Sequence, residues 1–128
     1  MVRHTVDLGA DSFVTRVQQE GIVVIDFWAA WCAPCRAFAP IFEAAAAKHP
    51  DLVWGKVDTE AEPELSSALA IRSIPTLMVF RDGILVFSQP GMLPGPALEQ
   101  LVTQVRALDM DDVRRRVTKQ QSEAARVG

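Results

Sequence analysis

The 128-residue sequence has little of several things that would point to a ligand. It contains only two cysteines and two histidines, and His4 and His49 are not at the spacing of metal ligands. With no second cysteine pair, a complete four-ligand zinc site is therefore disfavoured. Its 13 Lys and Arg residues are outnumbered by 16 Asp and Glu residues, which gives a formal net charge of −3. The sequence thus lacks the basic surface expected of a nucleic-acid-binding protein.

Long hydrophobic runs are also missing. The longest apolar segment, Ile22–Trp28, is interrupted by Asp26 and is too short to span a bilayer. The residues from Met1 to His4 lead into a mixed segment without the apolar core of a signal peptide. Hydrophobic residues nevertheless make up 49% of the chain, enough to form the core of one domain. We therefore expect a soluble cytoplasmic protein with no membrane association.

The two cysteines lie close together in the stretch Trp31-Cys32-Ala33-Pro34-Cys35. Cysteines at this spacing can close a small disulfide ring or supply half of a zinc site, but a strand before and a helix after favour redox chemistry. A helix N-terminus stabilises a thiolate, so Cys32 should have a lowered pKa. Cys35, one turn deeper, is placed to resolve a mixed disulfide, and Pro34 fits an early helical position.

Hydrophobic periodicity predicts alternating strands and helices along the chain. Asp11 and Ser12 offer N-cap side chains for the first helix, in which Phe13, Val14 and Val17 should face the core. Pro40 should kink the second helix. The predicted strands are 5–8, 22–28, 52–58, 76–80 and 84–88, the last two joined by an Asp-Gly hairpin, and the predicted helices are 11–19, 33–48, 60–69 and about 97–108. This order implies an α/β protein with a mixed sheet and helices on both faces.

Two segments resemble the thioredoxin family: residues 26–36, with the sequence DFWAAWCAPCR, and residues 71–77, with the sequence IRSIPTL. The similarity extends from roughly Thr5 to Leu108. It implies a thioredoxin fold with a central five-stranded sheet, a thioredoxin domain over residues 1–108, and reduction of disulfides in client proteins. It also implies a monomer without a bound cofactor, which receives electrons from NADPH indirectly, through thioredoxin reductase.

The resemblance assigns catalytic roles to four residues. Cys32 would be the nucleophile that attacks a client disulfide, and Cys35 would resolve the mixed disulfide. Asp26 would lie behind the cysteines and shuttle protons for Cys35, with a pKa raised by desolvation. Lys56 matches the lysine that approaches this aspartate. The alternatives are that Asp26 is a buried structural group and that Lys56 only extends towards water.

The same resemblance predicts a client-binding surface. Ile74-Pro75 matches the family's cis-proline, which would leave the backbone of Ile74 free to pair with an extended client peptide. The alternative is an ordinary trans proline at a strand start. Ala33 stands where thioredoxins most often have glycine, which bears on the redox potential and on client fit. The rest of the predicted surface comprises Trp31, Ala33, Pro34, Gly91 and Met92, whereas Trp28 is interpreted as core packing.

Residues 109–128 depart from the family. Acidic residues come before basic ones, as a helix dipole favours, and the apolar stripe is thin. We expect a polar, helical extension that frays at its end and contributes little to the core, with a partner-docking element as the alternative. The residues concerned are Asp109, Asp111 and Asp112, then Arg114, Arg115, Arg116 and Lys119, with Met110, Val113 and Val117 in the stripe.

Two other functions compete with disulfide reduction. An oxidase or isomerase of the same fold would need an oxidising compartment, for which no export signal is seen. A binding or holdase module would use the apolar surface or the extension to hold partners, with redox activity secondary.

Overall fold

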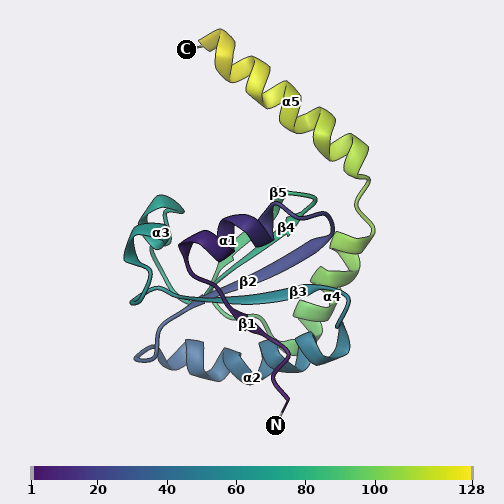
Figure 1. Cartoon of the computed structure of the whole chain (residues 1–128). Coiled ribbons are helices and arrows are strands. Elements are labelled where there is room, and N and C mark those ends of the chain that lie inside the picture. The colour runs from purple at the N-terminus through teal and green to yellow at the C-terminus, as the bar shows by residue number, and fades with distance from the viewer. Residues whose placement is uncertain (1, 128) are drawn as a thin grey trace.

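The computed structural model describes residues 2–127. Strands and helices alternate in the predicted order, and a further helix follows the domain (Figure 1). The elements are β1 (Val6–Asp7), α1 (Ala10–Val17), β2 (Ile22–Trp28), α2 (Ala33–Lys48), β3 (Val53–Asp58), α3 (Pro63–Ala68), β4 (Thr76–Arg81), β5 (Ile84–Pro90), α4 (Gly95–Arg106) and α5 (Met110–Val127).

The five strands form one mixed sheet, as predicted, and their order in the sheet is β1-β3-β2-β4-β5. The central strand β2 runs parallel to β3 and antiparallel to β4. All its residues before Trp28 are buried, which explains why Asp26 is the only charged residue in the run. Because β2 and β3 are parallel, their carboxyl ends meet at one edge of the sheet, where the cysteine loop begins.

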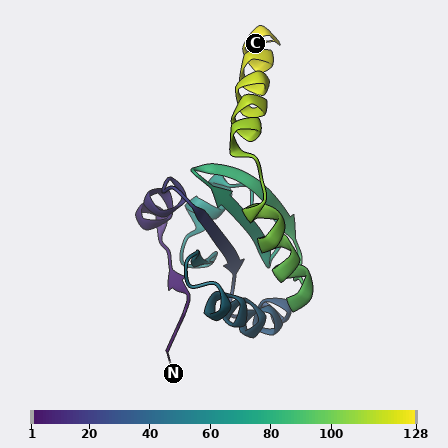
Figure 2. The same cartoon turned by 90° about the vertical axis from the view of Figure 1, so that its right-hand side faces the viewer.

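Helices cover both faces of the sheet (Figure 2). Side chains of α2 and α4 pack on one face, with Phe38, Phe42 and Leu98 fully buried against Val24 and Trp54. Residues of α1 and α3 pack on the other face, against the odd-numbered residues of β2. The alternation of β2 therefore places Asp26, like Val24, on the face that α2 covers.

The start of α1 differs from the prediction. The N-cap is Gly9, and the Ser12 hydroxyl accepts a 2.9 Å hydrogen bond from the backbone N–H of Gly9. Ser12 thus acts from the third helical position, as in a capping box, and neither it nor Asp11 is the N-cap. Val14 was wrongly placed on the core face, since it is 48% exposed while Phe13 and Val17 are buried. The helix also ends before Gln19.

Prolines mark the starts of three helices. Pro34, Pro63 and Pro96 lie in first turns, where a missing backbone N–H costs no hydrogen bond. The predicted start of α3 at residue 60 is wrong, because the Asp58 carboxylate accepts from the N–H of Glu60 and forms a turn instead. The bounds of α2 are as predicted, and the helix continues through Pro40. The kink there stays a prediction.

The β4–β5 hairpin turns at Asp82 and Gly83, as the sequence predicts. Both residues have positive φ, 53° and 81°, which a tight hairpin turn requires. Arg81, just before the turn, donates hydrogen bonds of 2.8 Å and 3.0 Å to the carbonyls of Val105 and Leu108. The hairpin therefore holds the end of α4 and the link to α5.

Residues 109–128 contain the predicted helix, α5, which projects away from the domain (Figures 1 and 2). Its first turn is nevertheless anchored, because Met110 is only 7% exposed and Arg114 pairs with Asp82 at 3.3 Å. The apolar stripe is therefore not uniformly solvated. The division of the chain at residue 108 and the fraying of the helix end stay predictions. Within the described part of the chain, no helix is long and apolar enough to cross a membrane.

Candidate active site

The two cysteines lie where β2 gives way to α2. Cys32 is the N-cap of α2, and its sulfur accepts a 3.2 Å hydrogen bond from the backbone N–H of Cys35. Their Cα atoms are 5.2 Å apart, and the side chains form a disulfide. The sulfur of Cys32 therefore occupies the helix N-terminus, where N–H groups and the dipole favour negative charge.

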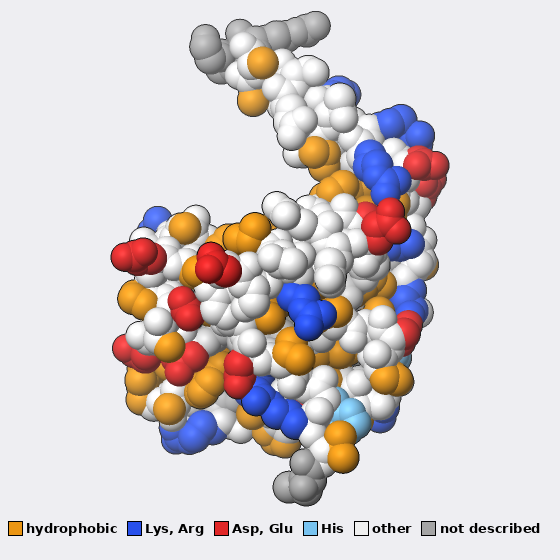
Figure 3. Space-filling view, viewed as in Figure 1, with side chains coloured by type: hydrophobic (Ala, Val, Ile, Leu, Met, Phe, Trp, Pro, Cys, Tyr) orange, Lys and Arg blue, Asp and Glu red, His pale blue; other side chains and the backbone are white. Residues whose placement is uncertain are grey.

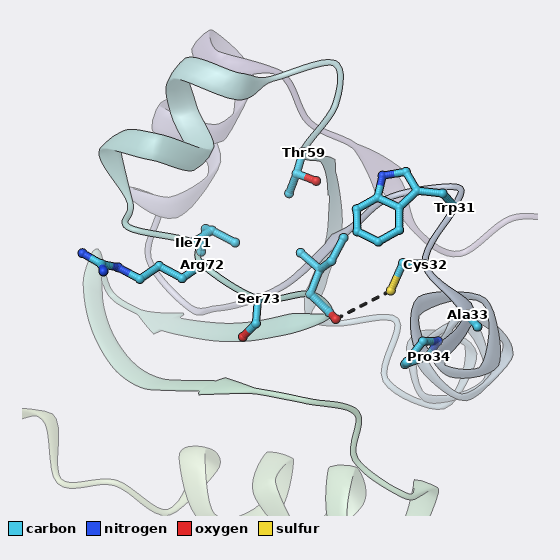
Figure 4. A pocket seen from close by; sticks show the side chains of 9 residues that line it. Trp31, Cys32, Ala33, Pro34, Thr59, Ile71, Arg72 and Ser73 are labelled. Carbon is cyan, nitrogen blue, oxygen red and sulfur yellow. Dashed lines mark hydrogen bonds between the residues drawn. The ribbon is translucent and has the colours of Figure 1, made fainter.

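The cis-proline loop faces this disulfide. The Ile74–Pro75 peptide bond is cis, which confirms the prediction. The Cys32 sulfur lies 3.6 Å from the carbonyl oxygen of Ile74 (Figure 4). On the other side of the proline, the N–H of Gly91 donates a 2.7 Å hydrogen bond to the Pro75 carbonyl. Segments far apart in the sequence therefore meet beside Cys32.

A pocket of about 480 Å³ opens between the cysteine loop and the cis-proline loop. Cys32 lines it and Cys35 does not, although both residues are buried, with exposed fractions of 4% and 2%. Of the predicted binding residues, Trp31, Ala33, Pro34 and Ile74 line it as well. Pro75 and Gly91 adjoin this wall without lining the pocket, and Met92, which is 39% exposed, does not line it either.

Sequence reasoning missed part of the lining: Thr59, Ile71, Arg72 and Ser73. Three of these precede the cis-proline in the recognised motif, so that motif could have indicated them. Thr59 follows β3, whose carboxyl end lies beside that of β2, and this topology was the available signal. Its N–H donates a 2.9 Å hydrogen bond to the carbonyl of Trp28, which fixes the two loops together.

Asp26 lies fully buried in β2, with an exposed fraction of 0%. Among the described residues, neither of its carboxylate oxygens has a hydrogen-bond partner. Desolvation raises the pKa of Asp26 to about 6, and the positive charge of Lys56 opposes this rise. The predicted direction of the pKa shift is confirmed. A carboxyl group with this pKa can both bind and release a proton near neutral pH.

Lys56 is the partner of Asp26 in the β2–β3 register, so their side chains start on the same face of the sheet. Its ammonium nitrogen lies over the ring of Trp28, 4.9 Å from the centroid. Trp28 in turn packs against the disulfide, in agreement with its interpretation as a packing residue. Lys56 therefore influences Asp26 through its charge and not through a hydrogen bond.

The site is suited to thiol chemistry. Across the described residues, no group of three or more His, Cys, Asp or Glu side chains is arranged to hold a metal ion. A disulfide at a pocket wall is suited to exchange with a second disulfide.

Comparisons with known proteins agree with this geometry. The family model "Thioredoxin" matches residues 4–104. The chain is 53% identical over 120 residues to "Putative thioredoxin 2" of Streptomyces coelicolor, covering 94% of this chain and 90% of the relative. It is 39% identical over 102 residues to a thioredoxin of Alicyclobacillus acidocaldarius, covering 79% of this chain and 97% of the relative.

Solved structures give the same result. A thioredoxin of Plasmodium falciparum superposes with a TM-score of 0.71 at 30% identity, over 78% of this chain and 97% of that chain. A mutant thioredoxin of Halobacterium salinarum gives a TM-score of 0.74 at 29% identity, over 81% of this chain and 91% of that chain. The chain therefore belongs to the thioredoxin family, as a protein-disulfide reductase whose redox group is the Cys32–Cys35 disulfide and not a bound cofactor.

Proposed function

We propose that Cys32, in the reduced protein, is the thiolate that attacks a client disulfide. Cys32 lines the pocket and is the N-cap of α2, whereas Cys35 does not line the pocket. Attack forms a disulfide between Cys32 and one client sulfur and releases the other client sulfur as a thiolate. The position of Cys32 on the pocket wall, which Cys35 does not share, is the observation that carries the assignment.

Cys35 then completes the exchange. Its thiolate attacks the Cys32 sulfur, closes the Cys32–Cys35 disulfide and releases the second client thiol. The client gains two electrons, and the protein loses two. Before this attack the Cys35 thiol must lose a proton, and Asp26 is the proposed acceptor. With a pKa of about 6, the Asp26 carboxyl is mostly ionised at neutral pH and can take that proton.

Lys56 has a supporting role in this proposal. Its charge lowers the pKa of Asp26 against the effect of desolvation, which keeps the carboxyl group ionised more of the time. Asp26 and Lys56 together would therefore set the pH range in which Cys35 is deprotonated. The alternative is that the Lys56 side chain only extends towards water and does not affect the reaction.

The client segment would lie across the pocket in an extended conformation. The backbone of Ile74, beside the Cys32 sulfur, would pair with it, while Trp31, Ala33 and Pro34 provide apolar contacts. Pro75, Gly91 and Met92 complete the proposed surface on the cis-proline side.

We further propose that the oxidised protein is recharged by an NADPH-dependent thioredoxin reductase and acts as a monomer in the cytoplasm. A reducing compartment suits a catalytic cysteine pair, because thiols there are kept available for exchange. The clients are proteins with accessible disulfides. We propose that residues 109–128 are not required for this reaction.

Reduction of insulin by dithiothreitol, followed by turbidity, tests the function. The wild type should accelerate precipitation, and Cys32→Ser should abolish the acceleration. If Cys32→Ser and the wild type delay aggregation equally, without reducing insulin, the protein is a holdase and the redox proposal is wrong.

A further inference from the structure

A hydrogen bond joins two loops at one wall of the pocket. The indole N–H of Trp31 donates to the Oε1 oxygen of Glu60 over 2.7 Å. Trp31 comes from the loop after β2, and Glu60 comes from the loop after β3. The proposed reaction assigns no role to Glu60, although it holds Trp31, an exposed residue of the pocket wall.

This contact fixes a side chain that would otherwise be free to rotate. Trp31 is 66% exposed, so packing alone does not hold its ring. A hydrogen bond to an ionised carboxylate is stronger than one between neutral groups. In Figure 4 the Trp31 ring stands beside Cys32 and reaches towards Thr59, forming one side of the pocket. Glu60 therefore determines where that side lies.

Glu60 has no ion-pair partner in the part of the chain that the structure describes. Among the described residues, no lysine, arginine or histidine forms a salt bridge with it, and only its Oε1 oxygen contacts Trp31. Residues 57–71 contain four acidic residues and neither lysine nor arginine. Figure 3 shows acidic side chains gathered over the part of the molecule where α3 lies.

The opposite wall of the pocket carries a positive charge. Arg72 lines the pocket from the cis-proline loop, and Figure 4 shows it on the side away from Trp31. Glu60 does not itself line the pocket, and the Arg72 guanidinium points away from Trp31, so a client segment that extends beyond the pocket would meet negative charge next to Trp31 and positive charge at the opposite end. Such an arrangement favours a partner with complementary charges in one orientation.

We propose that Glu60 is a positioning and specificity-determining residue. It holds Trp31 as a wall of the pocket, and its carboxylate selects clients that carry lysine or arginine next to the reactive cysteine, on the Trp31 side. This inference rests on the proposed function, since it concerns the clients of the same reaction. Because an exposed ion pair contributes little, the expected preference in kcat/KM is about two- to fivefold, and added salt should reduce it.

Three disulfide peptides that differ only in the residue beside the reactive cysteine, which is lysine, glutamine or glutamate, test the charge preference. The wild type should prefer lysine over glutamate, chiefly through KM. Glu60→Gln keeps an oxygen acceptor for Trp31 but removes the charge, so it should lose the preference. Glu20→Gln is the matched control, because Glu20 precedes β2 at the opposite end of that strand from the cysteines. It should keep the preference.

The positioning role needs a separate readout. The indole N–H resonance of Trp31, assigned by comparison with Trp31→Phe, should exchange slowly with solvent in the wild type and in Glu60→Gln. In Glu60→Ala it should exchange faster, and KM for the glutamine peptide should rise. Neither change is expected if Glu60 only carries surface charge, and their absence would overturn the positioning role.

The two proposals fail in different ways. If the wild type reduces all three peptides equally, or if Glu60→Gln retains the lysine preference, charge selection by Glu60 is overturned while the proposed function stands. If the wild type reduces no peptide, the proposed function itself fails.

Discussion

The buried carboxyl group of Asp26 makes a quantitative prediction about stability and pH. Its pKa is about 6 in the folded protein, against an ordinary value of 3.8, and desolvation is the main cause. Below the lower value both states hold the proton, and the group costs nothing through ionisation. As pH rises, the unfolded chain ionises first, so the folded state loses stability until the folded pKa is passed.

The size of this effect follows from the shift. Each pKa unit corresponds to about 1.4 kcal/mol, so a shift of about two units costs about 3 kcal/mol once Asp26 is ionised in both states. About 2 kcal/mol of this develops between about pH 4 and about pH 7. Other carboxyl groups with shifted pKa values are present in every variant, and their effects cancel in a comparison of variants.

Two substitutions isolate the effect. Asp26→Ala and Asp26→Asn both remove the titratable group, so each should gain stability relative to the wild type as pH rises. Alanine also leaves a small cavity, whose cost is the same at both pH values. At about pH 7 the alanine variant should be more stable than the wild type, and this advantage should shrink towards about pH 4.

Urea unfolding of the oxidised proteins at the two pH values is the assay. The disulfide stays closed throughout, so the cysteines do not titrate. The same variants, when reduced, should reduce a client more slowly in a single turnover, because Cys35 loses its proton acceptor. If the stability difference from the wild type does not change with pH and the rate is intact, Asp26 is a structural residue and the proton-shuttle role is wrong.

Three further predictions follow from the site and the extension. Lys56→Gln should raise the pKa of Asp26 further and move the pH dependence of reduction upward, whereas an unchanged profile would leave Lys56 without a role. In the reduced protein, alkylation should modify Cys32 before Cys35 and well below the pH at which an ordinary thiol ionises; preferential labelling of Cys35 would reverse their roles. Removal of residues 118–128 should change the unfolding free energy by no more than about 0.5 kcal/mol, while removal of 109–128 should cost more through Met110, although less than about 2 kcal/mol. Both truncated proteins should still reduce insulin, and a selective loss for one client would favour the docking role.

Local sequence patterns predict much of the fold. The run Ile22–Trp28 is buried on both faces as far as Phe27, and its apolar character, broken only by Asp26, predicted that placement. The Asp-Gly turn and the helix after Cys32 depend on backbone preferences that a few residues determine. The bounds of α2 were predicted because an apolar face and a cap agree there. The predicted helix starts were wrong where a side chain accepts a hydrogen bond from a backbone N–H group, as Ser12 and Asp58 do.

The active site was predicted less completely, because its pocket is made by tertiary contacts. The cysteines and Pro75 belong to local motifs and were found. Thr59 reaches the pocket only through the parallel pairing of β2 and β3, which no short motif encodes. Glu60 reaches the site through a hydrogen bond from Trp31, which lies 29 residues away in the sequence. The burial of Met110 likewise depends on where α5 leaves the domain, and a thin apolar stripe alone does not indicate it.

Trapping of the mixed disulfide tests the central claim most directly. Reduced Cys35→Ser lacks the resolving thiol, so after mixing with a disulfide client it should accumulate a covalent adduct. Peptide mapping by mass spectrometry should place the client on Cys32, and dithiothreitol should release it. Cys32→Ser should give little adduct under the same conditions, because Cys35 does not line the pocket. Absence of an adduct on Cys35→Ser, with Cys32 shown to be reactive, would contradict the proposed order of attack.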